Sequence, residues 1–140
     1  MHRRPFFAAV ALLLPLALAA AGCQAGGSSK KEPEFKVSGK VVRGGAPLPL
    51  DPAQAAAKAA FVMVKFIRGD GDYSNSTFAG TDGTFSLTLP KGKYGVQITH
   101  MGPGGDQLKG KFSDRKAKAK IEKEIAGDTV DFVIDLDQYK

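Results

Sequence analysis

Three acidic side chains that could bind a cation lie close together along the sequence, in two predicted turns. Asp70 and Asp72 alternate with glycines over residues 68–72, and Asp82 precedes Gly83. Calcium loops supply such oxygens in a fixed alternating spacing with a closing bidentate glutamate, which this segment lacks. Aspartate beside glycine is the usual composition of a tight turn. The sequence therefore predicts no metal site, and Asp70, Asp72 and Asp82 are the weak candidates for one.

Catalytic side chains are scarce. His2 belongs to the N-terminal stretch considered next, so His100 is the one histidine of the body, at the end of a predicted strand. A nucleophile needs a base beside it, and a transition metal needs several His or Cys ligands. His100 alone satisfies neither requirement. We therefore expect a partly exposed structural histidine, no enzyme activity and no cofactor.

The single cysteine, Cys23, follows three small residues, Ala20, Ala21 and Gly22. Before them come a basic start and an apolar run over 6–21. A positive start, a short apolar core and small residues before a cut are the layout of an export signal. The run is shorter than the ~20 apolar residues of a membrane-spanning helix. The sequence thus predicts an N-terminal signal helix within a signal peptide over 1–22.

This N-terminus resembles the signal of bacterial lipoproteins, whose lipobox reads Leu-Ala-Gly/Ala-Cys. The chain departs from it at Ala20, where leucine is commonest. The resemblance implies cleavage before Cys23, a diacylglyceryl thioether on its sulfur and a fatty acid such as palmitate on its new amine. Two or three acyl chains hold a protein stably at a membrane. The alternative is a secreted protein in which Cys23 is a free thiol.

The residues after Cys23 predict where the protein resides. Lipoproteins kept at the inner membrane often have aspartate next, whereas this chain has Gln24, which favours the outer membrane, facing the periplasm or the surface. Residues 24–34 are mostly Gly, Ser, Lys, Glu and Pro, so 23–34 reads as a flexible tether. We expect an exported protein whose partner is membrane lipid through Cys23.

Residues 35–137 have the pattern of a domain of short strands. Apolar residues alternate with polar ones over 35–41, 85–89, 94–98 and 130–136, and 61–67 is nearly all apolar. Gly, Pro and Asp turns separate these runs. The pattern predicts an all-β, antiparallel, Ig-like or prealbumin-like sandwich of about seven strands. In its last strand, the residues expected to face inward are Val130, Phe132, Ile134 and Leu136.

Two segments carry helical signals. Asp51 suits an N-cap and Pro52 a first helical position, so the alanine-rich stretch predicts a short helix over 52–60. Residues 116–125 fit a helix by propensity and a strand by context. We favour the strand, because a turn over 126–129 would join it to the last strand as a hairpin.

Five motifs of the body resemble, in order, those that open carboxypeptidase regulatory-like domains: VSGKVV at 37–42, GAPL at 45–48, FVMV at 61–64, TDGTF at 81–85 and LPKGKY at 89–94. The resemblance implies a prealbumin-like sandwich that is usually non-catalytic and is carried by enzymes or by small surface lipoproteins. Phe85 and Tyr94 would pack as a cross-strand aromatic pair. The related hydroxyisourate hydrolases need several histidines and a C-terminal Tyr-Arg-Gly-Ser motif, which this chain lacks.

Charge adds one exclusion. The formal net charge is +6, part of which belongs to the signal, and the lysines over 109–123 have one aromatic residue among them. This composition indicates a solvated face rather than a nucleic-acid site. The predicted function is a lipid-anchored cell-envelope lipoprotein with a non-catalytic binding or structural module. The alternative is an accessory domain that recognises carbohydrate or a partner protein.

Overall fold

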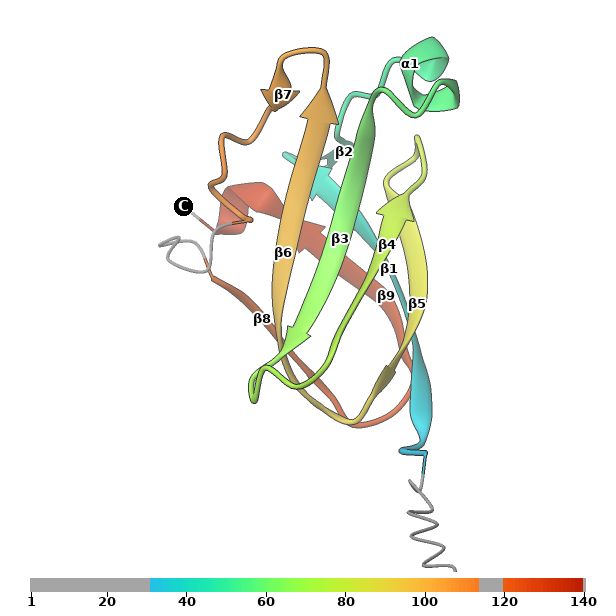
Figure 1. The fold of residues 1–140 in the computed structure, drawn as a ribbon, viewed down its shortest axis with the longest axis vertical. Coiled ribbons are helices and arrows are strands. Elements are labelled where there is room, and N and C mark those ends of the chain that lie inside the picture. The colour runs from blue at the N-terminus through green and yellow to red at the C-terminus, as the bar shows by residue number, and fades with distance from the viewer. Residues whose placement is uncertain (1–30, 114–119, 140) are drawn as a thin grey trace, which may run out of the picture. The chain divides into compact units, whose positions relative to one another are not determined.

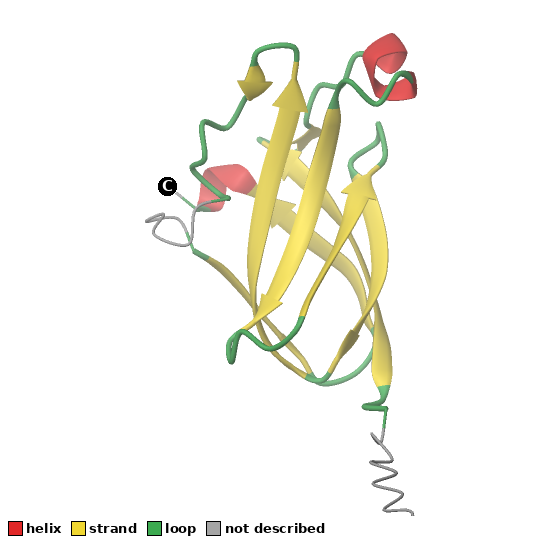
Figure 2. Cartoon of the chain, viewed as in Figure 1, coloured by secondary structure: helices red, strands yellow, loops and turns green. Residues whose placement is uncertain are grey.

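Two β-sheets face each other in the computed structural model of the chain, which describes residues 31–113 and 120–139 (Figure 1). Within these residues strands dominate, and helix is confined to two short pieces (Figure 2). The prediction of an all-β sandwich is therefore confirmed. Its physical basis is the alternation of apolar and polar residues, which gives each strand one face to bury.

The first sheet is built around β1. Its strands are β1 (Glu34–Arg43), β2 (Ala46–Pro47), β5 (Thr84–Pro90) and β9 (Thr129–Asp135). β2 and β5 pair with β1 in antiparallel fashion, and β9 pairs with β1 in parallel. The parallel pair brings the last strand, β9, beside the first strand, β1. The two ends of the described domain are therefore joined by strand pairing.

The second sheet is built around β3 and β6. Its strands are β3 (Phe61–Arg68), β4 (Ser74–Ala79), β6 (Gly92–Gly102), β7 (Gly105–Asp106) and β8 (Ile121–Ile125). β3 pairs with β4 and β6, and β6 also pairs with β7 and β8, all antiparallel. β3 and β6 thus run between opposite ends of the sandwich (Figure 1).

The core lies between the sheets and is filled by the inward face of each strand. Phe66 is fully buried at its centre, with its ring 6.2 Å from those of Phe85 and Tyr94. The expected cross-strand pairing of Phe85 with Tyr94 is wrong, because β5 and β6 belong to different sheets. Both rings instead contact Phe66. Other fully buried side chains are Val37, Val41, Val64, Leu89, Ile98, Ile121, Ile125 and Ile134.

The predicted helix is present but short. α1 spans Pro52–Ala56, and the Gln54 amide donates to Asp51 Oδ1 at 2.9 Å, as an N-cap requires. The helix ends before Ala60 because Lys58 has a left-handed φ of 57°. The amides of the two following residues turn back to the Gln54 carbonyl at 2.8 and 3.2 Å. A 3₁₀ turn, η1 (Leu136–Gln138), follows β9.

A β-bulge in β9 reverses part of the expected inward face. Val37 lies opposite Thr129, but Gly39 lies opposite Phe132, so β9 has one extra residue there. Asp131 takes a left-handed φ of 56° at this point. Val130 is consequently 66 % exposed, and its predicted inward orientation is wrong, whereas Ile134 and Leu136 are buried as expected.

Within the ambiguous segment 116–125, Ile121–Ile125 is the strand β8, and residues 114–119 lie outside the described part of the chain. The preference for a strand is therefore confirmed over 121–125. The hairpin expected at 126–129 is wrong, because β8 pairs with β6 and β9 pairs with β1. The connection crosses from one sheet to the other, which the local turn residues do not reveal.

Candidate functional site

A pocket of about 550 Å³ opens at one end of the sandwich, between the end of β1, α1 and the β6–β7 turn. We call it the end pocket. Figure 1 shows these elements gathered at the top of the domain, opposite the start of β1. Its volume lies within the range of small-molecule sites. It is lined by Arg43, residues 46–49, Asp51, Gln54, Ala60, residues 100–103 and residues 107–108.

His100 forms part of the wall of this pocket and is only 7 % exposed. The expectation of a partly exposed histidine is wrong, because the segment before α1 lies against the ring. His100 Nε2 is 3.0 Å from the Pro49 carbonyl oxygen. A carbonyl only accepts, so Nε2 donates the proton. In the neutral ring Nδ1 is then an acceptor, and it has no hydrogen-bond partner within the described residues.

Asp106 fixes the loop beside His100. Its Oδ1 accepts from the backbone amides of His100 and Leu108, both at 3.1 Å, and its Oδ2 accepts from the amide of Gly110 at 2.9 Å. The Gln107 amide donates to the His100 carbonyl at 2.7 Å. One carboxylate thus binds three backbone amides and connects the end of β6 to the loop that follows β7. The only sequence signal for it is an aspartate after two glycines.

Arg43 supplies the positive charge of the end pocket. It is exposed at the last position of β1, and within residues 31–113 and 120–139 its guanidinium makes no ion pair. Asp51 is the acidic group of the wall, and one of its oxygens caps α1. Gln54 and Gln107 add amides, with Gln107 Nε2 donating to the Gly105 carbonyl at 3.0 Å. Leu48 and Leu108 give the pocket apolar wall.

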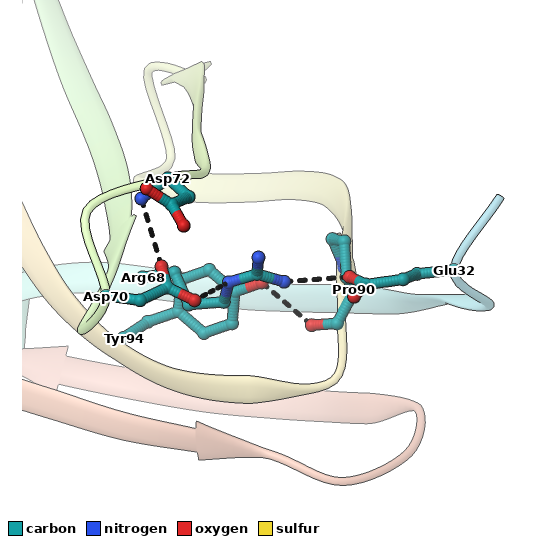
Figure 3. A network of polar contacts seen from close by, with 6 residues as sticks. All are labelled: Glu32, Arg68, Asp70, Asp72, Pro90 and Tyr94. Carbon is teal, nitrogen blue, oxygen red and sulfur yellow. Dashed lines mark hydrogen bonds and ion pairs between the residues drawn. The ribbon is translucent and has the colours of Figure 1, made fainter. Parts of the chain in front are cut away.

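The opposite end of the sandwich carries a second polar group, centred on Arg68 at the end of β3 (Figure 3). Arg68 Nη1 lies 2.7 Å from Glu32 Oε2, and Nε lies 2.7 Å from Asp70 Oδ2. The first contact is a hydrogen-bonded ion pair, whereas the second lacks hydrogen-bond alignment at Nε. The bond to Glu32 and the charge of Asp70 raise the pKa of Arg68. The charge of Arg68 is therefore already neutralised by its own chain.

Tyr94 lies beneath this group and is 1 % exposed. Its hydroxyl donates to the Pro90 carbonyl at 2.8 Å (Figure 3). Burial raises the pKa of the Tyr94 phenol, because the charged phenolate would lose its hydration. This bond locks the turn between β5 and β6 to the core rather than offering a reactive group.

The three candidate cation ligands are occupied by their own turns. Asp70 Oδ1 accepts from the Asp72 amide at 3.0 Å, and Asp82 Oδ1 accepts from the amide and hydroxyl of Thr84 at 3.0 and 2.7 Å. The Thr84 bonds lower the pKa of Asp82. The turns containing Asp70 and Asp82 lie at opposite ends of β4, so the structure does not bring them together. The described residues contain no group of three or more His, Cys, Asp or Glu that could hold a metal.

Cys23, Gln24 and the signal helix lie outside the described residues. No helix among the residues the structure describes is long and apolar enough to cross a membrane. Of the basic segment 109–123, residues 114–119 are likewise not described. On either side of that gap, Lys111 Nζ lies 5.3 Å from the centre of the Phe112 ring and Lys123 Nζ lies 4.8 Å from that of Phe132.

Sequence reasoning found His100 but not the pocket that contains it. Arg43, Gln54 and Gln107 come from three separate parts of the chain, and no local motif connects them. The nearest signal was the pair of prolines at 47 and 49 before the capping Asp51, which suggested only a turn and a helix start. The end pocket exists because β1, β3 and β6 all reach the same end of the sandwich.

No protein-family model matches the chain, and no curated protein matches it. Among solved structures, it resembles a DUF3823 family protein from Parabacteroides merdae, with 22 % identity and a TM-score of 0.47 over 74 % of this chain. A DUF3823 family protein from Bacteroides ovatus gives 20 % identity and a TM-score of 0.45 over 73 % of this chain. This chain covers 46 % and 43 % of those two proteins, less than half of each.

A third solved structure is the dioxygenase domain of a dioxygenase carbohydrate-binding protein fusion from a cellulolytic Streptomyces. It is 16 % identical, with a TM-score of 0.38 over 77 % of this chain and 83 % of that domain. These likenesses are to β-rich proteins and assign the chain neither a family nor an activity, since one fold hosts many functions.

Proposed function

We propose that this protein is a lipid-anchored lipoprotein of the cell envelope whose β-sandwich is a non-catalytic recognition module. The observation that carries the proposal is Cys23, the one cysteine of the chain, placed directly after small residues and an apolar run. Lipidation accounts for a lone cysteine in an exported chain, which disulfide formation within the chain does not. The Gly- and Ser-rich stretch that follows suits a tether.

The position of the end pocket is compatible with a recognition role. β1 starts at Glu34 and ends at Arg43 in the wall of the end pocket. Ten strand residues span about 33 Å. The end pocket and the start of β1 therefore lie at opposite ends of the sandwich. The residues that lead into β1 thus leave the end pocket open to a ligand, as a binding module requires.

The domain type that fits this proposal is the carboxypeptidase regulatory-like one. The motif at 37–42 lies on β1, that at 61–64 on β3, and those at 81–85 and 89–94 at the two ends of β5. The chemistry of the end pocket favours carbohydrate over a flat protein surface as the partner, because polar side chains converge on a concavity. Outer-membrane residence, with the domain facing the periplasm or the surface, is the location that Gln24 favours.

Metabolic labelling tests the anchor. Cells that express the full-length chain are fed an alkyne-bearing fatty acid, and the protein is recovered from membrane and soluble fractions. We expect label and membrane residence in the wild type and loss of both in Cys23→Ala. Cys23→Ser, which replaces only the sulfur by oxygen, should lose both as well, because the thioether needs the sulfur. Label that persists in Cys23→Ala would overturn the anchor.

A further inference from the structure

We propose that the end pocket binds a uronic acid unit, with the sugar carboxylate on Arg43 and a sugar hydroxyl donating to His100 Nδ1. This inference names a ligand for the recognition module proposed above and rests on that proposal. Three observations carry it: an acceptor on the buried residue His100 that has no hydrogen-bond partner among the described residues, an arginine that makes no ion pair among them, and a pocket of monosaccharide scale.

His100 is the hydrogen-bond acceptor of the proposed site. Its ring is buried, and its tautomer is fixed because Nε2 donates to the Pro49 carbonyl. Nδ1 therefore keeps a lone pair, on a residue of the pocket wall, that no described residue fills. Nδ1 is not among the fully buried atoms that lack a partner, so an external group can reach it. The partner that completes His100 must be a donor, such as a hydroxyl or an N–H group.

Arg43 is the group of the proposed site that binds the carboxylate. A guanidinium binds a carboxylate with two parallel hydrogen bonds, which fixes both position and orientation. Arg68, at the other end of the sandwich, is neutralised by Glu32 and Asp70, whereas Arg43 has no acidic partner among the described residues. Arg43 thus gives the end pocket a cation that is open to an external anion.

The rest of the wall distinguishes between anions. Asp51 is a negatively charged acceptor, so a compact, strongly anionic ligand such as inorganic phosphate would be repelled by it. A uronic acid carries one carboxylate and several hydroxyls, which match Arg43, His100 and Asp51 in turn. The amides of Gln54 and Gln107 can donate to or accept from further hydroxyls.

The apolar part of the wall and the pocket size fit the same ligand. Leu48 and Leu108 are buried side chains that line the end pocket. A sugar ring has a C–H face that can lie on such a surface while its hydroxyls reach the polar groups. The volume of about 550 Å³ accommodates one sugar ring with room for a linked neighbour. A zwitterionic amino acid is the competing occupant, because its ammonium group could bind Asp51.

Isothermal titration of the full-length protein, purified from whichever cell fraction contains it, tests the proposal. The probes are sodium glucuronate, glucose, alanine and sodium phosphate. We expect saturable binding of glucuronate and binding of the other three weaker by about tenfold or more, since a charged hydrogen-bonded pair is worth that factor. Equal binding of glucose, tighter binding of alanine or phosphate, or no binding of glucuronate would each overturn the proposal.

Two variants locate the site. Arg43→Gln should weaken glucuronate binding about tenfold or more. Arg68→Gln, a matched arginine change at the opposite end, should leave it unchanged. An unchanged affinity in Arg43→Gln would overturn the assignment. Fractionation of the same cells reports on the anchor separately, so failure of the pocket and failure of the lipid attachment give different results.

The role of His100 is tested in the wild-type protein, without a substitution at this residue. Long-range ¹H–¹⁵N spectra of the wild-type protein should show protonated Nε2 and unprotonated Nδ1 in the free state. Glucuronate should shift the Nδ1 resonance as it accepts a hydrogen bond. A resonance that does not move at saturation would place the ligand elsewhere and overturn the proposal.

Discussion

Arg68 joins the start of the folded chain to the turn between β3 and β4, through a 2.7 Å ion pair with Glu32. The two residues are separated by β1, β2 and α1 in the sequence, and the contact lies where the described chain approaches β1 (Figure 3). Glu32 lies only two residues before β1. The pair thus links the residues just before β1 to the turn between β3 and β4, and this junction lies at the end of the sandwich opposite the end pocket.

Glu32→Gln should loosen this junction without unfolding the domain. Exposed ion pairs contribute little to stability, and Glu32 is 60 % exposed. We expect faster amide hydrogen exchange at the first residues of β1, Glu34 and Phe35, which pair with β5. The midpoint of urea unfolding should be unchanged at high salt and at most slightly lower at low salt. Glu124→Gln, on β8, is the control and should leave exchange at the start of β1 unchanged. Equal exchange in Glu32→Gln and wild type would show that the pair does not hold the junction.

Gly39→Ala should destabilise the protein severely. A Cβ atom at position 39 would collide with the Phe132 carbonyl oxygen and lie 2.9 Å from Phe85 Cζ. Neither the parallel β1–β9 pair nor the aromatic core can move without breaking other contacts. Overpacking costs about 1–3 kcal/mol, and collision with backbone puts this site at the upper end or above. Urea unfolding measures the change.

Gly127→Ala is the matched control for that substitution. Gly127 precedes β9, and no atom lies within 4 Å of an added Cβ there. We expect a change within about 0.5 kcal/mol, as for ordinary surface substitutions. Comparable losses in the two variants would mean that β9 does not press against Gly39 as described.

The strands could be predicted from the local alternation of apolar and polar residues. The pairing of strands that are distant in the sequence could not. Alternation located the strands, and the Asp51–Pro52 pair located the start of the helix, because both signals depend on neighbouring residues. The parallel pairing of Val41 with Ile134 joins residues far apart in the chain, and no turn motif encodes it. The end pocket has the same origin, since Arg43 and His100 come together only when β1 and β6 reach the same end of the sandwich.

The bulge at Asp131 makes a direct prediction about neighbouring apolar residues. Ile134 is fully buried and Val130 is 66 % exposed, although both lie at inward positions of a regular strand. Ile134→Ala should cost about 2–5 kcal/mol, the range for core truncation. Val130→Ala should change stability by less than about 0.5 kcal/mol. Urea unfolding of the two variants measures both free-energy changes. Similar losses of stability in Ile134→Ala and Val130→Ala would exclude the bulge.

Ionisation of Tyr94 should lower the free energy of unfolding in alkali. Burial raises its pKa above the ordinary 10.0, so the unfolded chain ionises at a lower pH than the folded one. The stability that Tyr94 provides is therefore fully present below pH 10 and is lost as pH rises through the folded-state pKa. We expect the free energy of unfolding to fall with rising pH in this window, and Tyr94→Phe to remove part of that slope.

Tyr94→Phe should also cost about 1 kcal/mol at neutral pH, because the Pro90 carbonyl loses its 2.8 Å hydrogen bond. Tyr73→Phe is the matched control. Tyr73 is partly exposed, and its ring centre lies 6.4 Å from that of Tyr94. The measurement is urea unfolding at neutral pH and at two alkaline values, with Tyr94 ionisation followed by ultraviolet absorbance. A Tyr94→Phe variant with the full wild-type alkaline slope would mean that ionisation of another group causes it.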